Sequence, residues 1–267
     1  MHNDIDTLFA NLWQDYLHIT PSAEKVHKLL AQEKGDAIIN DHIALRTFNI
    51  DKVNLDKLAA HFLALGYQEK GQYDFEQKKL RAKHFEHPDD TNPKVFISEL
   101  LVEEFSPALQ ALVTNMVKQV ADDAVLADNF LYSGTHWQVS SEDYALLLEE
   151  SEYAAWMSAW GYRANHFTVS VNYLKDYSEL ADVNSLLKDH GFVLNTSGGE
   201  IKGGADVCLA QSSTMADKMP VQFSDKQLEI PSCFYEFAQR YKMADGQLYT
   251  GFVAASADKI FESTNVM

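Results

Sequence analysis

Apolar residues near the start of the chain recur at the spacing of an amphipathic helix. They are Ile5, Leu8, Phe9, Leu12 and Trp13, and they predict a helix with one buried face. A break follows at Thr20-Pro21, after which Ser22 is placed to cap a second helix that runs through Leu30. We therefore expect residues 1–36 to form a helical N-terminal segment.

The pattern then changes to strands, and it does so twice in the same order. Residues 41–48 alternate as a strand does, a helix follows and ends at Gly66, and three strand-like runs come next, at 67–69, 79–85 and 95–101. Residues 164–172 start the order again, with a helix ending at Gly191 and runs near 207–211, 221–223 and 233–237. Between the two copies, residues 105–161 have helical spacing and predict a group of inserted helices.

The two copies also share a histidine at the same place in the first strand. His42 precedes Gly66 by 24 positions, and His166 precedes Gly191 by 25 positions. Repetition of this kind predicts two β-α-β-β-β units, over residues of about 37–104 and 162–240. Two such units placed side by side make a curved mixed sheet around a cup. We therefore expect an α+β fold in which residues 1–267 form a single domain.

The amino-acid composition is that of a globular protein with an acidic surface. Apolar residues make up 46% of the 267 positions, and 39 acidic residues outnumber 22 basic ones, for a net charge of −17. Such a surface repels phosphate backbones and anionic lipids, which argues against nucleic acid and membranes as partners. The chain has two cysteines and begins without the features of a signal peptide, so we expect a reducing, cytoplasmic setting. The sequence leaves the oligomeric state open.

Two histidines and a glutamate are the candidate metal ligands. Because side chains at i, i+2 and i+4 of a strand share a face, His42 points the same way as Arg46. The repeat would bring His42 next to His166 inside the cup, and Glu236, in the apolar run 233–237, can supply a third ligand. Two histidines and one carboxylate leave open positions on a metal, as in non-haem Fe(II) oxygenases, although zinc binds the same ligands.

Other histidines and glutamates have simpler interpretations. A single histidine in a strand is usually a structural residue, and it is the repeat-equivalent position of His42 and His166 that favours a metal site. We interpret Glu99 as part of a structural ion pair or of a solvated strand face. His84 and His87 point to opposite sides of a strand, so they do not share a metal, and we expect them at the surface.

Arg46 is the candidate substrate-binding residue because it shares the face of His42. A guanidinium binds a carboxylate through two parallel hydrogen bonds, so Arg46 predicts an anionic substrate. The alternative is a salt bridge to a buried acidic neighbour.

Residues 196–204 are rich in glycine and predict a flexible loop at the mouth of the cup, and the polar residues 211–214 are placed to line it.

Several motifs resemble those of one enzyme family. They are DHIALRTF at 41–48, RANHF at 163–167, LAQSSTMAD at 209–217, VQFSD at 221–225 and FYEFAQR at 234–240. Together they resemble the 2-oxoadipate dioxygenase/decarboxylase family of the vicinal oxygen chelate superfamily, whose fold is built from β-α-β-β-β units. The resemblance extends from about residue 20 to GFVAASADKIFEST at 251–264. Better-known members of the family are longer and carry insertions.

The resemblance implies an activity and a role for each candidate residue. His42, His166 and Glu236 would hold Fe(II), with zinc or nickel as substitutes in a purified sample, and Arg46 would bind a substrate carboxylate. The reaction would convert 2-oxoadipate and dioxygen to 2-hydroxyglutarate and carbon dioxide. Two alternatives remain open at this point: a metal-dependent isomerase, lyase or hydrolase on the same fold, and a non-catalytic protein that binds small molecules.

Overall fold

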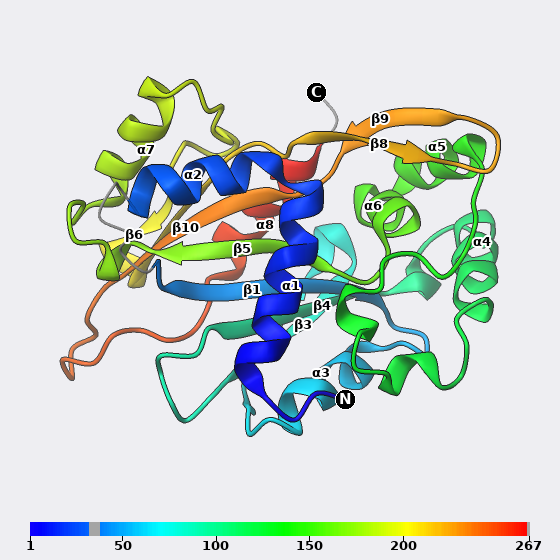
Figure 1. Ribbon diagram of the computed structural model, residues 1–267, viewed down its shortest axis with the longest axis horizontal. Coiled ribbons are helices and arrows are strands. Elements are labelled where there is room, and N and C mark those ends of the chain that lie inside the picture. The colour runs from blue at the N-terminus through cyan, green and yellow to red at the C-terminus, as the bar shows by residue number, and fades with distance from the viewer. Residues whose placement is uncertain (32–37, 266–267) are drawn as a thin grey trace.

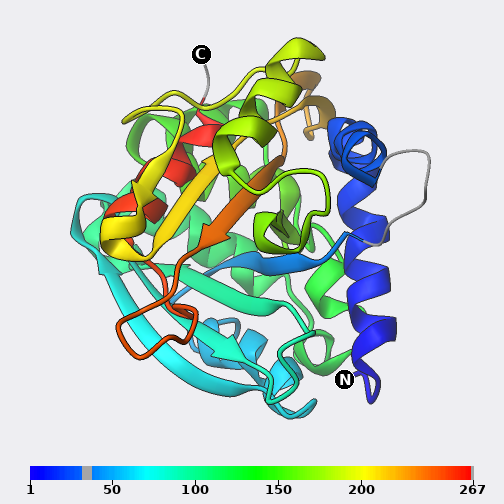
Figure 2. The same cartoon turned by 90° about the vertical axis from the view of Figure 1, so that its left-hand side faces the viewer.

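A curled sheet of eight strands organises the chain in the computed structural model, which describes residues 1–31 and 38–265 (Figure 1). The strand order is β2-β3-β4-β1-β5-β10-β7-β6. The strands are β1 (Asn40–Phe48), β2 (Gln68–Phe75), β3 (Leu80–Glu86), β4 (Lys94–Leu100), β5 (Ala164–Ser170), β6 (Lys202–Gly204), β7 (Leu209–Ser213) and β10 (Phe234–Arg240). A separate pair, β8 (Lys218–Gln222) and β9 (Gln227–Pro231), forms a hairpin outside this sheet. The curl gives the half-barrel that is visible when the molecule is turned (Figure 2).

The sheet consists of two halves that meet between β1 and β5. These two strands pair antiparallel, whereas β1 pairs in parallel with β4, and β5 pairs in parallel with β10. Each half has the order β-α-β-β-β: β1, α3 (Leu55–Leu63), β2, β3 and β4 in the first, and β5, α7 (Leu180–Asp189), β6, β7 and β10 in the second. The predicted fold class and its curved mixed sheet are confirmed.

One strand of the second half differs from the prediction. The run 221–223 belongs largely to β8, outside the main sheet, and its expected place is taken by β6. β6 lies within the stretch 196–204, for which the sequence predicts a flexible loop. Its Lys-Gly-Gly sequence has no apolar alternation, so only its pairing with β7, which sets Lys202 opposite Gln211, makes it a strand.

Four helices cover the convex face of the sheet (Figures 1 and 2). α1 (Ile5–Ile19) packs on β5, α2 (Pro21–Ala31) on β10, α3 on β4, and α7 on both β7 and β10. Trp13 and Tyr16 of α1 lie against the ring of Phe167, so the outward-facing positions of β5 are buried as well as the inward-facing ones. Because both faces of β5 are covered, every residue of this strand is buried.

The second helix begins earlier than the sequence predicts. α2 starts at Pro21, so Ser22 lies inside the helix and the expected cap at Ser22 is wrong. Its Oγ makes no hydrogen bond to the described residues, and its amide donates to Asp217 Oδ2 at 2.8 Å. Proline fits the first position of a helix because it has no amide proton to satisfy and its backbone angle is already helical. The predicted helical segment 1–36 is helical up to Ala31, and its residues 32–36 lie outside the described residues.

The insertion between the halves forms three helices at one end of the molecule. They are α4 (Pro107–Lys118), α5 (Ser141–Glu150) and α6 (Glu152–Trp160). Ser106, Ser140 and Ser151 each precede one of these helices and accept a hydrogen bond from its first turn, so each helix begins where the sequence supplies a cap. Short 3-10 turns complete the connections: η1 (Glu76–Lys78), η2 (Val102–Glu104), η3 (Ala124–Leu126), η4 (Phe130–Tyr132), η5 (Val171–Tyr173) and η6 (Ala205–Val207).

The C-terminal segment covers the concave face. α8 (Ala254–Ile260) and η7 (Phe261–Thr264) lie inside the curl, where α8 contacts β2, β6 and β7 (Figure 2). The hydrophobic pattern predicts no element here, because so short a helix does not show its period clearly. None of the described helices is long and apolar enough to cross a bilayer.

Candidate metal centre

The three predicted ligands meet on the concave face of the sheet. His42 on β1 lies opposite Thr168 on β5, which in turn lies opposite Glu236 on β10. His166 comes two positions before Thr168, so it shares the same face. The ligand atoms of His42, His166 and Glu236 lie within 4.8 Å of one another, and all three side chains are buried. His166 Nε2 is 3.1 Å from Glu236 Oε2, and His42 Nε2 is 3.6 Å from Glu236 Oε1.

Neighbouring side chains set the position of the proton on both imidazoles. His42 Nδ1 is 2.8 Å from Asp41 Oδ1, and His166 Nδ1 is 3.0 Å from Asn165 Oδ1. Both partner atoms are acceptors, so each ring carries its proton on Nδ1 and turns the lone pair of Nε2 towards Glu236. Histidine binds a metal in this way, with a hydrogen-bond acceptor behind the ring that fixes its orientation.

Hydrogen-bond acceptors crowd the centre of the cluster. The two Nε2 atoms and both Glu236 oxygens converge there, and the donors that reach them are Gln211 Nε2, 2.6 Å from Glu236 Oε1, and Thr168 Oγ1, 3.1 Å from His42 Nε2. Glu236 Oε2 is buried without the geometry of a hydrogen bond to any described residue. A buried oxygen without a donor is destabilising, and a cation at this point would satisfy it together with the two nitrogens. The donor set therefore fits a divalent metal.

Electrostatics hold two of the ligands in the forms that bind metals. Burial lowers the pKa of His166 and outweighs the opposing attraction of Glu236, so this imidazole is neutral at pH 7. Burial alone would raise the pKa of Glu236, but its contacts with His42, His166 and Gln211 outweigh this and hold the pKa below the ordinary value. A neutral imidazole and an ionised carboxylate are the species that coordinate a metal ion.

A buried ion pair supports the histidine from β1. Arg240 donates from Nε and Nη2 to the two oxygens of Asp41 at 2.6 and 2.8 Å, and both side chains are buried. Burial raises the pKa of Asp41, but the charge of Arg240 and the hydrogen bonds from His42 and Arg240 hold it well below its usual range. Asp41 therefore stays ionised and keeps accepting the Nδ1 proton of His42.

The first half of the sheet has a different residue at the place that matches Glu236. The register puts Phe96 there, so this half contributes no carboxylate to the cup at that position. Glu99 points to the other face, where it pairs with Arg81 and accepts a hydrogen bond from the amide of Leu55 at 2.7 Å. The interpretation of Glu99 as a structural ion pair is confirmed.

The expectation that both His84 and His87 lie at the surface is wrong for His84. This ring is buried on the concave face of β3, opposite Phe96 of β4. Its Nδ1 is 2.9 Å from the Tyr73 hydroxyl, and its Nε2 is 2.9 Å from Glu86 Oε1. Both ring nitrogens are satisfied within the protein, so His84 has a structural role. The ring of Phe252, just before α8, covers it at 5.2 Å between ring centres, and nothing in the sequence around His84 predicts this contact.

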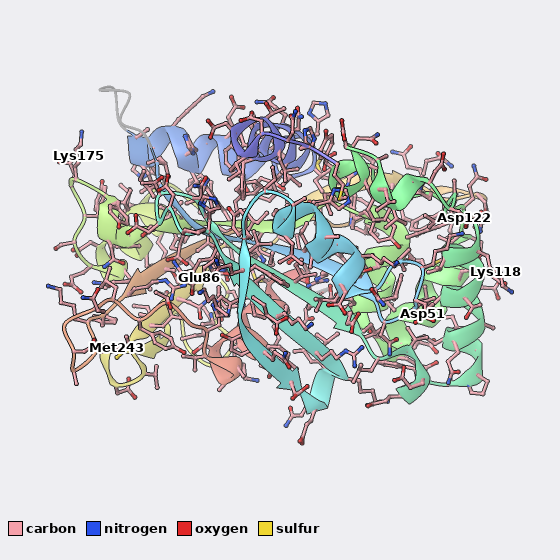
Figure 3. All side chains as sticks on the ribbon, turned by 90° about the horizontal axis from the view of Figure 1, so that it is seen from below. Asp51, Glu86, Lys118, Asp122, Lys175 and Met243 are labelled. Atoms are coloured by element: carbon pink, nitrogen blue, oxygen red, sulfur yellow. The ribbon has the colours of Figure 1, made fainter. Side chains whose placement is uncertain are left out.

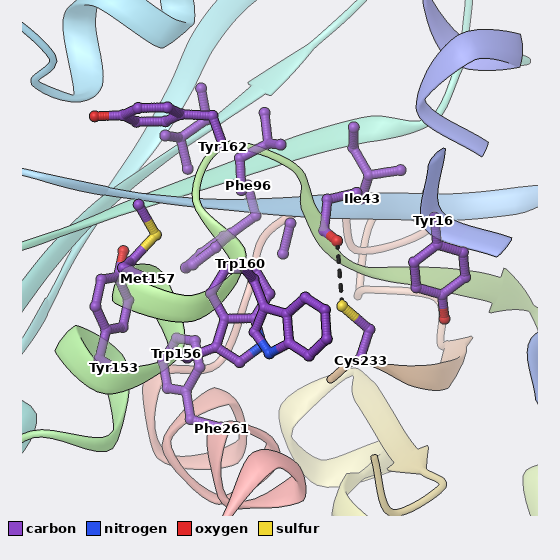
Figure 4. Packing of buried hydrophobic residues seen from close by; sticks show 14 of the residues in the cluster. Tyr16, Ile43, Phe96, Tyr153, Trp156, Met157, Trp160, Tyr162, Cys233 and Phe261 are labelled. Carbon is purple, nitrogen blue, oxygen red and sulfur yellow. Dashed lines mark hydrogen bonds between the residues drawn. The ribbon is translucent and has the colours of Figure 1, made fainter. Parts of the chain in front are cut away.

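Arg46 lies deep in the structure, beneath three aromatic rings. Its side chain is 1% exposed, and the guanidinium carbon is 4.8 Å, 4.9 Å and 5.8 Å from the ring centres of Tyr153, Trp156 and Phe261. These three rings lie close together at one side of the core (Figure 4). Arg46 Nη1 is 3.3 Å from Glu152 Oε1, so the salt bridge to an acidic neighbour, which the sequence left open as an alternative, is present.

The cavity beside the cluster is almost filled. Its volume is about 20 Å³, and its wall opposite the sheet consists of Phe252, Ala257, Ile260 and Phe261. Pockets that hold small ligands usually measure about 300–1,000 Å³. With the C-terminal segment in this position, the cavity is too small for a ligand of that size. A larger cavity, of about 650 Å³, opens between Trp137 and Phe223, and none of the predicted site residues lines it.

Lys202 is a buried cation near the cluster, and its charge is weakly compensated. The side chain lies on the inner face beside Gln211, and Nζ donates to the carbonyl of Asn195 at 2.5 Å and to that of Glu200 at 3.5 Å. Burial lowers the pKa of Lys202 from 10.5 to about 8, against the opposing attraction of Glu236 and Glu262. The folded protein therefore releases this proton at a lower pH than the unfolded chain does.

We expect this difference to make the unfolding free energy rise with pH between about 8 and 10.5, because only the unfolded chain still binds the proton there. In Lys202→Met the rise should be smaller by roughly 2–3 kcal/mol. Urea unfolding of both proteins at pH 7 and 10 measures the effect, with the exposed Lys118→Met as the matched control. Parallel pH profiles for wild type and Lys202→Met would contradict the prediction.

Some residues of the centre were not predicted from the sequence, although the sequence contains features that point to several of them. Asp41 and Asn165 precede the two histidines in the two copies, and this matched acidic-or-amide position marks the supporting acceptors. Gln211 was predicted to line the cup, but its bond to Glu236 was not. Glu152 carries no signal, because it comes from the inserted helices and meets Arg46 only through tertiary packing.

Comparisons with known proteins point to one family. The family model described as 2-oxoadipate dioxygenase/decarboxylase matches residues 14–247. The 2-oxoadipate dioxygenase/decarboxylase of rice is 35% identical over 284 residues, which cover 97% of this chain and 78% of that protein. The corresponding protein of Arabidopsis thaliana is 34% identical and covers 93% of this chain and 74% of that protein.

Solved structures agree with this assignment. The rice hydroxyglutarate synthase in complex with 2-oxoadipate superimposes with a TM-score of 0.89 at 35% identity and covers 97% of this chain and 91% of that one. A protein from Shewanella frigidimarina, provisionally described as a hydrolase, gives a TM-score of 0.92 at 64% identity over 96% of this chain and 100% of that one. A glyoxalase superfamily protein from Ralstonia eutropha, with a TM-score of 0.71 at 20% identity over 92% of this chain and 85% of that one, shares the fold. The chain belongs to the 2-oxoadipate dioxygenase/decarboxylase family.

Proposed function

We propose that this protein binds Fe(II) through His42, His166 and Glu236 and uses dioxygen to convert 2-oxoadipate to 2-hydroxyglutarate and carbon dioxide. The observation that carries the proposal is the buried cluster itself: two Nε2 lone pairs and an ionised carboxylate within 4.8 Å of one another. Two histidines and one carboxylate on one side leave room for a substrate and dioxygen on the other, as in the non-haem Fe(II) oxygenases. The names of the rice and Arabidopsis relatives support the choice of substrate.

The residues around the cluster give the substrate a defined orientation. Arg46 and the histidine of β1 share the concave face, so a diacid can present one carboxylate to Arg46 and its 2-oxo acid end to the ligand cluster. Phe252 and Phe261 cover the cluster and keep bulk water away from it. When bound, Fe(II) would supply the Lewis acidity and the electrons that dioxygen chemistry needs.

The reaction balances without any further reactant. 2-Oxoadipate and dioxygen together contain the atoms of 2-hydroxyglutarate and carbon dioxide. The bond between the carboxylate and the oxo carbon breaks, the carboxylate leaves as carbon dioxide with its own two oxygens, and both atoms of dioxygen enter 2-hydroxyglutarate. The oxo carbon becomes the new carboxylate, and the neighbouring carbon receives the hydroxyl group. The four-electron reduction of dioxygen is matched by oxidation of the substrate carbons.

The test is anaerobic reconstitution of the protein with Fe(II), followed by oxygen-uptake measurements with 2-oxo acids of different length. We expect one dioxygen to be consumed and one carbon dioxide to be released for each 2-hydroxyglutarate formed, with 2-oxoadipate as the best substrate. A zinc-dependent hydrolase, lyase or isomerase on the same fold would consume no dioxygen. Absence of uptake with every 2-oxo acid, in protein shown to contain iron, would contradict the proposal.

A further inference from the structure

A second pocket opens directly outside Arg46. It has a volume of about 260 Å³ and lies among the turn between β2 and β3, the start of α6 and the end of the chain. Glu152, Tyr153 and Phe261 line it, and each of these side chains also contacts the Arg46 guanidinium. Arg46 itself does not line the pocket but lies directly behind these three side chains.

Phe261 separates this pocket from the cavity of the ligand cluster. Its side chain lines the pocket of about 260 Å³ on one side and the cavity of about 20 Å³ on the other. Phe261 belongs to η7, the last turn of the described chain, which lies at the end of the segment covering the cup. Because Phe261 lines both spaces, displacement of its ring would open a path between them.

The hydrogen bonds of Arg46 are incomplete. Nη1 is 3.3 Å from Glu152 Oε1, Nη2 is 3.3 Å from the Thr264 hydroxyl, and Nε is buried without a partner among the described residues. A guanidinium in a bidentate pair with a carboxylate makes bonds of about 2.7–2.9 Å. Glu152 thus neutralises Arg46 from one side without occupying its strongest binding geometry.

Glu152 is free to leave this position because it stands at the boundary with solvent. Its side chain is 23% exposed, whereas that of Arg46 is 1% exposed. When the Glu152 carboxylate turns towards the open pocket it becomes hydrated. The buried guanidinium of Arg46 cannot reach solvent, so it needs another anion. Exchange of one carboxylate for another keeps the buried charge paired throughout.

We propose that this pocket is the entrance for the dicarboxylate substrate and that Glu152 is the resident counter-ion that the incoming carboxylate replaces at Arg46. The proposal rests on the function proposed above, since it concerns the same arginine. The substrate carboxylate forms the bidentate pair with Arg46, Glu152 turns outward, and Phe261 moves aside to admit the 2-oxo acid end to the cluster.

The charges at the rim of the pocket favour an anion. Lys78 and Lys79 line it together with Glu150 and Glu152, and with Arg46 behind Glu152 the cations outnumber the carboxylates by three to two. In a protein whose net charge is −17, this local excess of positive charge attracts anions towards one opening. Lys79 is held in place over the ring of Phe105, 4.3 Å from its centre. The Glu150 carboxylate accepts hydrogen bonds from the amide and the hydroxyl of Ser106, which hold it in place away from Arg46.

The test measures the binding of glutarate, a dicarboxylate without the oxo group, by titration calorimetry to the metal-loaded protein. In Glu152→Gln the competing charge is gone, so glutarate should bind about three- to fivefold more tightly, the size of one partly exposed ion pair. The matched control is Glu229→Gln, which removes an equally negative exposed charge from β9 and should leave binding unchanged. Glutarate affinity that is equal or weaker in Glu152→Gln would overturn the proposal.

A second variant tests the rim without touching Arg46. Lys78→Gln should weaken glutarate binding about twofold at low salt, and the difference should vanish at high salt, because screening removes long-range attraction. Lys118→Gln, at the outer edge of α4, is the control for loss of a positive charge elsewhere (Figure 3). Equal affinities of Lys78→Gln and Lys118→Gln at low salt would contradict the assignment of the entrance.

Failure of this proposal is distinguishable from failure of the proposed function. If wild type consumes dioxygen with 2-oxoadipate but Glu152→Gln binds glutarate no better, the entrance is wrong and the activity stands. If Glu152→Gln binds glutarate more tightly but no 2-oxo acid supports oxygen uptake, the entrance stands and the dioxygenase function is wrong.

Discussion

Glu236→Gln should remove metal binding and all turnover while leaving the fold intact. The substitution keeps the size of the side chain but takes away the one carboxylate of the proposed ligand set. Replacing a residue that only supports a metal ligand usually costs about 10- to 100-fold in metal affinity. Loss of a ligand itself should therefore exceed about 100-fold, and turnover should fall at least as far.

The metal-free form of this variant should be as stable as metal-free wild type. Four acceptor atoms converge at the cluster, and Glu236 Oε2 makes no hydrogen bond there. The amide of a glutamine brings two donors into this crowd of acceptors, which offsets the loss of the Gln211 bond to a charged oxygen. Metal content after reconstitution and urea unfolding of the metal-free proteins give the two measurements.

Glu99→Gln is the matched control for this experiment. Glu99 is also a buried glutamate on a central strand, but it faces the convex side, where it pairs with Arg81. Its substitution should lower stability and leave metal content unchanged. Wild-type metal affinity in Glu236→Gln would show that Glu236 is not a ligand.

Asp41→Asn should destabilise the protein by about 3–5 kcal/mol, because it leaves the buried charge of Arg240 without its partner. Arg240 is 5% exposed and makes two short bonds to the Asp41 carboxylate. The neutral amide keeps at most one of these bonds and none of the charge attraction. Urea unfolding at pH 7, compared with wild type, measures the loss.

The double variant Asp41→Asn, Arg240→Met is the internal control for this prediction. Removing both charges should recover part of the stability, because the cost arises from an unpaired buried charge and not from the absence of the pair. A double variant less stable than Asp41→Asn alone, or a single variant within about 1 kcal/mol of wild type, would contradict this account.

The Asp41 carboxylate also makes the unfolding free energy depend on pH in acidic solution. The pKa of Asp41 in the folded protein lies well below its unfolded value of 3.8, so its contribution is present above that pH and is lost as the pH falls below it. When the pH is lowered from 5 to below 3.8, the unfolding free energy should therefore fall less in Asp41→Asn than in wild type. Unfolding free energies measured at descending pH provide the comparison.

Strand periodicity and repetition were enough to predict the fold class and to select two histidines. Alternation places His42 and Arg46 on one face, and the matched spacing of the two copies relates His42 to His166. These features are local, because a strand has a period of two wherever it lies. The structure brings both histidines together on the concave face, as the repeat predicts, and Glu236 lies beside them.

The repeat could not show which strand positions match across the copies when the pattern is weak. β6 has a Lys-Gly-Gly sequence that predicts a loop, and only the register shows that Phe96 occupies the place in the first half that Glu236 occupies in the second. Pairing between strands decides register, and the partner strand is distant in sequence. A shift of one residue turns every side chain to the opposite face.

The sequence by itself thus determined the curved α+β sheet, the inward-facing histidines and an arginine beside them, because these follow from short-range periodicity and from the repeat. Only the tertiary structure decided how deeply Arg46 is buried, that Glu152 neutralises it, and that Phe261 stands between the entrance and the ligand cluster. These contacts join β1 to the inserted helices and to the end of the chain. Their positions depend on how separate elements pack, and no local pattern in the sequence records that packing.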